Sequence, residues 1–173
     1  MTPEGKAQLK IDEGFRAVAY PDPLSPLAKA RALPLAKRPR GWERLPGDPW
    51  TIGYGHTGLG VQPGLEWERW EADMALDTDV SKAERLLDRD IKWWRNLDPV
   101  RQDVISSMTF NMGWDNPRTE ALEGFAAFRT TLGHIKAGRY AQAAEAMLDS
   151  LWARQVGDRA KRLSREMATG RRG

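Results

Sequence analysis

The sequence WTIGYGHTG at residues 50–58 combines β-forming residues with three glycines. Trp, Thr, Ile and Tyr favour the half-buried surface of a pleated sheet, whereas glycine in a strand marks a bulge or a close approach of the backbone to another group. The stretch therefore predicts a strand, followed by a turn whose backbone approaches another group closely.

Two further elements are predicted upstream of this strand. Residues 17–20 read AVAY and predict another strand, which stops at residues 21–23 (PDP) because proline cannot donate to a sheet ladder and restricts the residue before it. Residues 2–4 (TPE) resemble an N-cap, a proline at the first helical position and an acidic first turn. A short helix that ends near Gly14 is therefore expected before the first strand.

Between the two strands lies a segment of different composition. Residues 24–47 contain four prolines and six basic residues against Glu43 alone, which gives a net charge of +5. We interpret the segment as a surface insertion that could include one helical turn in the Ala/Leu-rich stretch at residues 27–36. A solvated loop is the simpler interpretation, and contact with an anionic partner is the alternative.

The rest of the chain has helical periodicity. A long amphipathic helix is predicted from about Glu66, because apolar residues recur at steps of three and four. These residues are Trp70, Met74, Ala75, Val80, Ala83, Leu86, Leu87 and Ile91. A helix with a buried face should follow Asp98 and end at Gly113, and others are expected at about 122–137, 140–150 and 157–168.

The composition excludes several kinds of chemistry. The chain has no cysteine, which excludes disulfides, thiolate zinc sites and thiol nucleophiles, and with only two histidines we predict neither a metal site nor a cofactor. No run approaches the roughly 20 apolar residues of a membrane span. Charged residues interrupt the N-terminus, so we expect no secretion signal. The net charge of +3 and pI near 9.3 indicate a mildly anionic partner.

Two carboxylates lie at predicted element ends. Glu13 ends the first helix, and Asp22 lies nine positions later at the end of the first strand, so the two could face one cleft. Hydrolysis of a glycosidic bond needs such a pair, because one carboxyl protonates the leaving oxygen while the other, ionised, acts on water or on the sugar cation. Charged surface residues are common, and the pair alone is weak evidence.

The sequences around these carboxylates carry a specific resemblance. The runs KIDEGFR at residues 10–16, AYPDP at 19–23 and WTIGYGHT at 50–57 resemble the catalytic segment of phage-type lysozymes, glycoside hydrolase family 24. That pattern is a Glu, eight residues, an Asp, and then a Thr that opens a TIGYGH-like strand. FNMG at residues 110–113 and the sequence from Trp152 to Arg162 resemble the family's later helices.

This resemblance implies roles for three residues. Glu13 would be the general acid, Asp22 the carboxylate that acts on water or stabilises charge, and Thr51 a hydroxyl that positions the water. The alternative for Thr51 is an ordinary strand residue. Far more residues separate Asp22 from Thr51 than the family's usual few, so Asp48 is an alternative carboxylate, which we interpret more simply as part of a turn.

Three supporting residues follow from the same resemblance. Arg159 would reach Glu13 and orient its carboxylate, and Asn111 would donate or accept a hydrogen bond with an N-acetyl sugar. A solvent-facing arginine and a helix-end asparagine are the alternatives. His56 lies in the WTIGYGHT motif at residues 50–57, but it is more simply interpreted as a hydrogen-bonded structural residue. Four tryptophans at helical spacing are expected in the core or at helix contacts: Trp67, Trp70, Trp93 and Trp94.

The resemblance implies an α+β, mostly helical, lysozyme-like fold with two lobes in a single domain, residues 1–173. Residues 1–65 would form an N-terminal catalytic lobe with a small antiparallel sheet and the basic insertion. Residues 66–173 would form a helical lobe that begins with a long inter-lobe helix.

The implied protein is a monomeric endolysin, a muramidase that hydrolyses the β-1,4 bond between N-acetylmuramic acid and N-acetylglucosamine in peptidoglycan. It would be made in the cytoplasm of the infected bacterium and reach the periplasm and wall after a holin-type protein permeabilises the membrane, without stable membrane insertion of its own. Its activity should fall with salt, because the wall is anionic.

Two other functions remain open. One is a catalytically inactive module that binds peptidoglycan. The other is a basic helical protein that binds nucleic acid through residues 24–47 and 154–173, each with a net charge of +5. No nucleic-acid motif supports the second alternative, and we expect no nucleic-acid partner.

Overall fold

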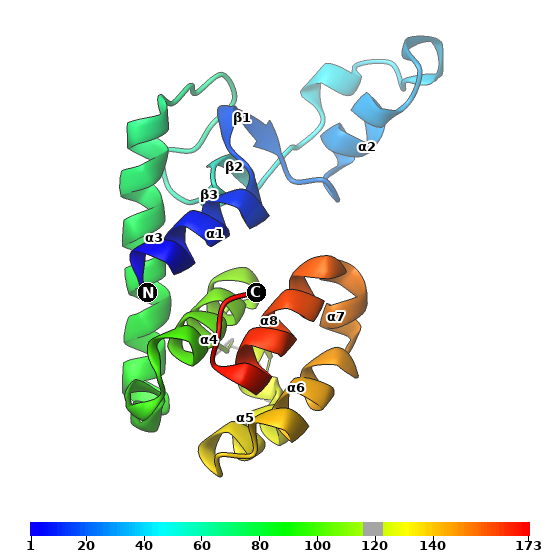
Figure 1. Cartoon of the computed structure of the whole chain (residues 1–173). Helices are drawn as coiled ribbons and strands as arrows, with labels where there is room; N and C mark the ends of the chain where they lie inside the picture. The colour runs from blue at the N-terminus through cyan, green and yellow to red at the C-terminus, as the bar shows by residue number, and fades with distance from the viewer. Residues whose placement is uncertain (116–122) are drawn as a thin grey trace. The chain divides into compact units, whose positions relative to one another are not determined.

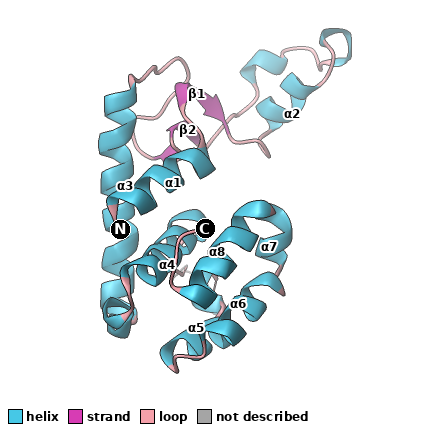
Figure 2. Cartoon of the chain, in the orientation of Figure 1, coloured by secondary structure: helices cyan, strands magenta, loops and turns pink. Residues whose placement is uncertain are grey.

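The computed structural model describes residues 1–115 and 123–173, and it confirms an α+β, mostly helical fold (Figure 2). The strands are β1 (Arg16–Pro21), β2 (Trp50–Gly53) and β3 (His56–Thr57). The α-helices are α1 (Pro3–Glu13), α2 (Pro26–Ala32), α3 (Arg69–Asp90), α4 (Pro99–Met112), α5 (Arg129–Lys136), α6 (Tyr140–Leu148), α7 (Leu151–Val156) and α8 (Asp158–Thr169). Short 3-10 helices are η1 (Leu35–Lys37), η2 (Trp42–Arg44), η3 (Lys92–Asn96) and η4 (Gly124–Ala127).

The chain divides into two compact units. Unit 1 comprises Met1–Asp12 and Asp79–Gly173, and unit 2 comprises Glu13–Thr78. The sheet belongs entirely to unit 2, whereas α4 to α8 belong to unit 1. Helix α3 contributes its first half to unit 2 and its second half to unit 1. No helix in the described part of the chain is long and apolar enough to cross a membrane.

The sheet of unit 2 is antiparallel with the order β1-β2-β3. Its register places Tyr20 opposite Thr51 and Pro21 opposite Trp50, and on the other side Thr51 lies opposite Thr57. The buried residues of the small core around this sheet are Ala19, Leu27, Trp50 and Ile52. Because β2 is the central strand, Thr51 has a neighbouring strand on each side.

The insertion between β1 and β2, residues 24–47, is a folded arm rather than a solvated loop (Figure 1). Ser25 caps α2, with its side chain accepting a hydrogen bond from the Ala28 N–H at 3.1 Å, and Pro26 occupies the first turn. Leu27 and Ala30 then pack inward, 4% exposed each. The loop interpretation is wrong here, because a capped helix start followed by buried apolar residues outweighs the many prolines.

Gly47 allows the end of the arm to return closely against the sheet. A Cβ atom at this position would lie 2.9 Å from Pro21 Cβ and 2.9 Å from Trp50 Cζ2. Such contacts are closer than real Cβ atoms show, so a larger residue would push the arm away from the strand ends. The Asp22 N–H also donates to the Gly47 carbonyl at 3.0 Å, which fastens the two ends of the arm together.

Helix α3 begins at Arg69, three residues after the predicted start, and its buried face differs from the prediction. Trp70 and Met74 are 59% and 62% exposed. The buried residues are Ala72, Leu76, Val80, Ala83 and Leu87. Each residue advances about 100° around the helix axis, which places Trp70 and Met74 on a different face from this buried stripe. The expectation that Trp70 is a core or contact residue is therefore wrong.

Unit 1 has the larger core. Its buried residues are Leu87, Trp94, Val104, Ile105, Met108, Trp114, Phe125, Ala126, Ile135, Ala143, Met147, Trp152, Ala160, Leu163 and Met167. Trp94 is fully buried, Trp93 packs against this core, and Trp67 packs against the core of unit 2, as predicted for these three tryptophans.

The helix predicted at about 122–137 consists of two elements. The described residues of this range form η4 and α5, with a break at Phe128, and residue 122 lies outside the described residues. Phe125 and Phe128 pack their rings against each other at a centroid distance of 5.7 Å. Helical periodicity did not predict the separate helix α7 after Ser150, and only the resemblance noted for the sequence from Trp152 to Arg162 implied a helix here. Ser150 caps α7 by accepting from the Ala153 N–H at 3.1 Å.

Candidate active site

Glu13 is the last residue of α1 and the first residue of unit 2. It is half-buried, and its Oε2 lies 3.7 Å from the position that a Cβ atom on Gly55 would occupy. Gly55 belongs to the tight turn between β2 and β3. The close approach expected for the glycine-containing stretch occurs at Gly53, where a Cβ atom would lie 3.0 Å from Ala72 Cβ, while Gly55 lies at ordinary contact distance from the Glu13 carboxylate.

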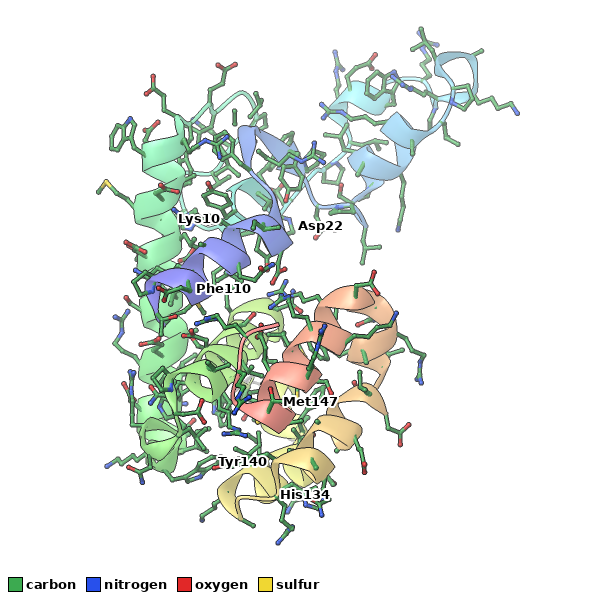
Figure 3. All side chains as sticks on the ribbon, viewed as in Figure 1. Lys10, Asp22, Phe110, His134, Tyr140 and Met147 are labelled. Carbon is green, nitrogen blue, oxygen red and sulfur yellow. The ribbon has the colours of Figure 1, made fainter. Side chains whose placement is uncertain are left out.

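Asp22 follows directly after β1, where the chain enters the arm (Figure 3). Its N–H donates to the carbonyls of Gly47 and Pro49, at 3.0 Å and 2.9 Å. Its Oδ1 accepts a hydrogen bond from the Leu24 N–H at 2.6 Å, which closes an Asx-turn. The backbone on both sides of the arm therefore fixes the half-buried carboxylate of Asp22 at the end of the strand.

Thr51 and Tyr20 form a cross-strand pair beside these carboxylates. Burial raises the pKa of the Tyr20 phenol, and the nearby charge of Glu13 raises it further, while Arg16 and a hydrogen bond with Thr51 act in the opposite direction. Directly opposite residues of an antiparallel pair have their side chains on the same face. Tyr20 therefore contacts Thr51 and lies within the field of Glu13.

The sequence reasoning did not single out Tyr20 as a site residue. A usable signal was present, because Tyr20 lies two positions before Asp22 and alternate residues of a strand point to the same face. The sequence did not show the register of β1 on β2, because these two strands are separated by the whole arm.

Asp48 has the features of a turn residue. It is exposed in the turn before β2, and it lines a pocket of about 540 Å³ together with Pro49, Trp50, Thr57, Gly58 and Val61. The lining of that pocket includes none of Glu13, Asp22 and Thr51. This placement favours Asp22 over Asp48 as the carboxylate of the candidate site.

His56 packs against an aromatic neighbour in unit 2. Its ring and the ring of Trp67 have centroids 5.3 Å apart, and in the sheet His56 lies opposite Ile52. This contact agrees with a structural interpretation of His56, in which the ring supports the turn that carries Gly55.

The predicted supporting residues of unit 1 lie in two places. The Trp152 Nε1–H donates to Asn111 Oδ1 at 2.9 Å, so the amide oxygen of Asn111 is held by the indole and its NH2 group is directed elsewhere. Trp152 also lines a pocket of about 420 Å³ between η4, α5 and α7. Other residues of its lining are Phe128, Arg129, Thr131, Asp149, Ser150 and Gln155. The pocket has both apolar and polar walls.

Arg159 lies in a charged cluster at the start of α8. Its Nε is 3.5 Å from Asp12 Oδ2, and its Nη2 donates to Ser107 Oγ at 3.2 Å. The side chain is 10% exposed, which makes the solvent-facing alternative wrong. Arg162 also pairs with Asp12, which immediately precedes Glu13 in the chain. The predicted contact between Arg159 and Glu13 itself stays a prediction.

In the described ranges 1–115 and 123–173, no three His, Asp or Glu side chains gather as a metal site would require.

A family model described as phage lysozyme matches residues 38–171, which is more than half of the chain. The chain belongs to the phage lysozyme family. The match includes Thr51, His56, Asn111 and Arg159, whereas Glu13 and Asp22 precede it. For this member of the phage lysozyme family, the two carboxylates are therefore supported by motif spacing and by their placement beside β2, and not by the matched range.

A relative of this chain occurs in a eukaryote. The chain is similar to the protein described as "Probable T4-type lysozyme 1" of Dictyostelium discoideum, with 28% identity over 103 residues. The aligned region covers 58% of this chain and 56% of that protein. This chain thus spans about half the length of the relative.

Proposed function

We propose that the chain is a muramidase, which hydrolyses the β-1,4 bond between N-acetylmuramic acid and N-acetylglucosamine in peptidoglycan. One observation carries the proposal beyond family membership: Glu13, Asp22 and Thr51 all lie on or next to the one small sheet of unit 2, with Thr51 on its central strand. Glu13 lies against the β2–β3 turn, Thr51 occupies the central strand, and Asp22 ends the strand beside it.

In this proposal the three residues divide the reaction between them. Glu13, protonated, donates its proton to the glycosidic oxygen as the bond to the sugar carbon breaks, so that the leaving sugar departs as a neutral alcohol. Asp22 is ionised and stabilises the positive charge that develops on the sugar or takes the proton of the attacking water. The Thr51 hydroxyl holds that water, and the phenol of Tyr20 orients the Thr51 hydroxyl.

Unit 1 carries groups of its own that suit a glycan. The NH2 group of Asn111 is available to donate to the carbonyl of an N-acetyl group, since Trp152 occupies the amide oxygen. The indole of Trp152 and the ring of Phe128 offer apolar surface in the adjoining pocket, and Arg129 and Asp149 offer charges of both signs. Such a mixed lining suits a sugar polymer that carries peptides.

For the biological role we propose host lysis. The enzyme would accumulate in the cytoplasm of an infected bacterium and reach the wall once a holin-type protein has permeabilised the membrane. It would act as a monomer, without a cofactor.

The proposal is tested by the substitution Glu13→Gln. The amide cannot deliver a proton, so release of reducing ends from purified peptidoglycan should fall by roughly a hundredfold or more, while circular dichroism stays unchanged. Glu145→Gln, an exposed change on α6, is the matched control and should retain full activity. Substantial hydrolysis by Glu13→Gln would contradict the catalytic assignment. A wild-type chain that binds peptidoglycan without releasing reducing ends would identify an inactive binding module.

A further inference from the structure

The arm, residues 24–47, has an apolar tip that no other part of unit 2 covers. Leu33 and Leu35 are 42% and 72% exposed, and the residues between and beside them, Ala32, Pro34 and Ala36, are exposed as well. Leu27, at the base of the same arm, is only 4% exposed because it packs in the core around Trp50. The arm thus buries one leucine at its base and exposes Leu33 and Leu35 in the segment after α2. Figure 1 shows the course of the arm.

Positive charge surrounds this tip. Arg31 and Lys37 flank it directly, and Arg40 and Arg44 follow within the arm, all four exposed. The net charge of the arm is +5, which is larger than the net charge of +3 of the whole chain. The arm is therefore one of two segments with a net charge of +5, beside residues 154–173, and it also exposes leucines.

The tip is held in a defined shape. Arg38 donates from Nε to the Leu33 carbonyl at 3.0 Å and from Nη2 to the Arg31 carbonyl at 3.1 Å. Its guanidinium also lies 4.5 Å from the centroid of the Trp42 ring. These contacts fold residues 31–38 into a closed loop before any partner arrives, which lowers the ordering cost of binding.

We propose that the tip of the arm docks on the surface of an anionic phospholipid bilayer. Leu33 and Leu35 would enter the boundary between headgroups and acyl chains, while Lys37 and Arg40 would lie among the lipid phosphates; the Arg31 guanidinium lies over the Trp50 ring at the base of the arm. A polyanion such as a wall glycan or a nucleic acid would account for the basic residues but would leave the leucines in water. A lipid surface satisfies both features at once.

This docking is peripheral and reversible, because the tip is short and carries only two leucines. It is independent of the proposed hydrolysis, since neither Glu13 nor Asp22 takes part in it. Its effect would be to hold the protein at the membrane that borders the wall, where a bilayer rich in acidic lipid lies next to the glycan.

The test is co-sedimentation of the full chain with vesicles of phosphatidylglycerol and phosphatidylethanolamine at low salt. The wild type should bind these vesicles and not vesicles of phosphatidylcholine. The double variant Leu33→Ser/Leu35→Ser should weaken binding by about tenfold or more. The double variant Lys37→Glu/Arg40→Glu should weaken it further, by roughly fivefold for each charge removed and more for the reversal.

Matched controls separate the tip from general surface effects. Leu59→Ser removes a fully exposed leucine from another loop of unit 2, and Lys92→Glu/Lys136→Glu reverses two exposed charges of unit 1. Both should bind vesicles like the wild type. Circular dichroism of each variant checks that it is folded, and Glu13→Gln should bind vesicles normally even though it cannot hydrolyse peptidoglycan.

Three results would overturn the inference. The first is a wild type that does not bind the anionic vesicles, and the second is equal vesicle binding by the tip variants. The third is loss of binding to purified, lipid-free peptidoglycan by the tip variants with vesicle binding intact, which would assign the arm to the wall instead.

Discussion

Tyr20 connects groups of the candidate site that lie far apart in the sequence. It is opposite Thr51 in the sheet, it precedes Asp22 by two positions, and the charge of Glu13 acts on its phenol. A half-buried phenol that hydrogen-bonds a threonine restricts the direction in which the threonine hydroxyl can bond to water. We therefore expect Tyr20 to position Thr51 rather than to touch substrate.

The raised pKa of Tyr20 leads to a prediction on alkaline stability. Because burial holds the pKa of the phenol above its ordinary value near 10, the folded chain favours the neutral phenol. The resulting stability is fully present below that ordinary value and is lost as pH rises through the raised pKa. Tyr20→Phe should thus lose less unfolding free energy than the wild type between about pH 8 and about pH 11, measured by urea denaturation. Tyr140→Phe on α6 is the control, and an alkaline loss in Tyr20→Phe equal to that of the wild type would refute the idea.

The two candidate carboxylates, Asp22 and Asp48, can be separated by paired substitutions. Asp22→Asn keeps the oxygen that accepts from the Leu24 N–H, so the fold should persist, but it removes the negative charge beside Thr51. Hydrolysis of purified peptidoglycan should fall by roughly a hundredfold or more for Asp22→Asn and remain near wild type for exposed Asp48→Asn. The reverse order would mean that the arm has transferred the catalytic role to the second strand.

At the scale of elements, the predictable parts are those with local signals. The start of α1 was predicted correctly because Thr2 and Pro3 form a cap, with Thr2 Oγ1 accepting from the Gly5 N–H at 3.0 Å. The strands were predicted from β-forming residues and the prolines that end the first of them. Glu13, Asp22 and Thr51 came from a motif, and the pairing that brings the strand of Thr51 beside the strand that Asp22 follows joins residues about 30 positions apart.

The features that sequence reasoning missed, or predicted only in part, depend on distant partners. For α2 the sequence indicated no more than one helical turn within residues 27–36. The full helix is stabilised by Leu27, which packs against the core around Trp50, and by the Ser25 cap, which was hidden in a basic, proline-rich segment. Trp70 was assigned to the wrong face of α3, since periodicity gives the spacing of a stripe and not which stripe is covered. Such choices are made by tertiary contacts, which one sequence does not display.

The structural role of α2 predicts how the arm tolerates change. Leu27→Ala removes buried atoms and should lower the free energy of unfolding by about 2 to 4 kcal/mol, measured by urea denaturation. Leu35→Ala, at the exposed tip, should leave stability near that of the wild type. Equal effects of the two changes on the free energy of unfolding would show that α2 does not pack against the core around Trp50. By the same argument, replacing the whole arm with a short turn should destabilise unit 2 by uncovering Trp50.

At the scale of the whole molecule, Asp103 binds together segments from both ends of the chain. The buried carboxylate accepts from the Thr2 N–H at 2.8 Å, from the Thr2 hydroxyl and from Arg172. A Cβ atom on Gly5 would lie 2.4 Å from Asp103 Oδ2, so α1 can approach α4 this closely only with glycine at that position. Asp103 thus joins α1, α4 and the C-terminal segment of unit 1.

Removing this carboxylate should destabilise unit 1 strongly. Asp103→Ala leaves the Thr2 donors and Arg172 without their acceptor, and it should lower the free energy of unfolding by roughly 3 kcal/mol. Asp158→Ala is the matched control, because its side chain is 95% exposed and forms a surface ion pair with Lys161, and it should unfold like the wild type. A wild-type urea midpoint for Asp103→Ala would contradict the structural role.

The division of unit 1 into two stretches of chain has a consequence for synthesis on the ribosome. Residues 13–78 form unit 2 without interruption, so this unit can fold as soon as it leaves the exit tunnel. The first twelve residues, in contrast, belong to a unit whose remaining partners have not yet been translated. At roughly 5 to 20 residues per second, Thr2 waits on the order of 5 to 20 s for Asp103 to be made, and Arg172 comes later still. The nascent chain therefore carries the complete unit 2 before the later residues of unit 1 have been made.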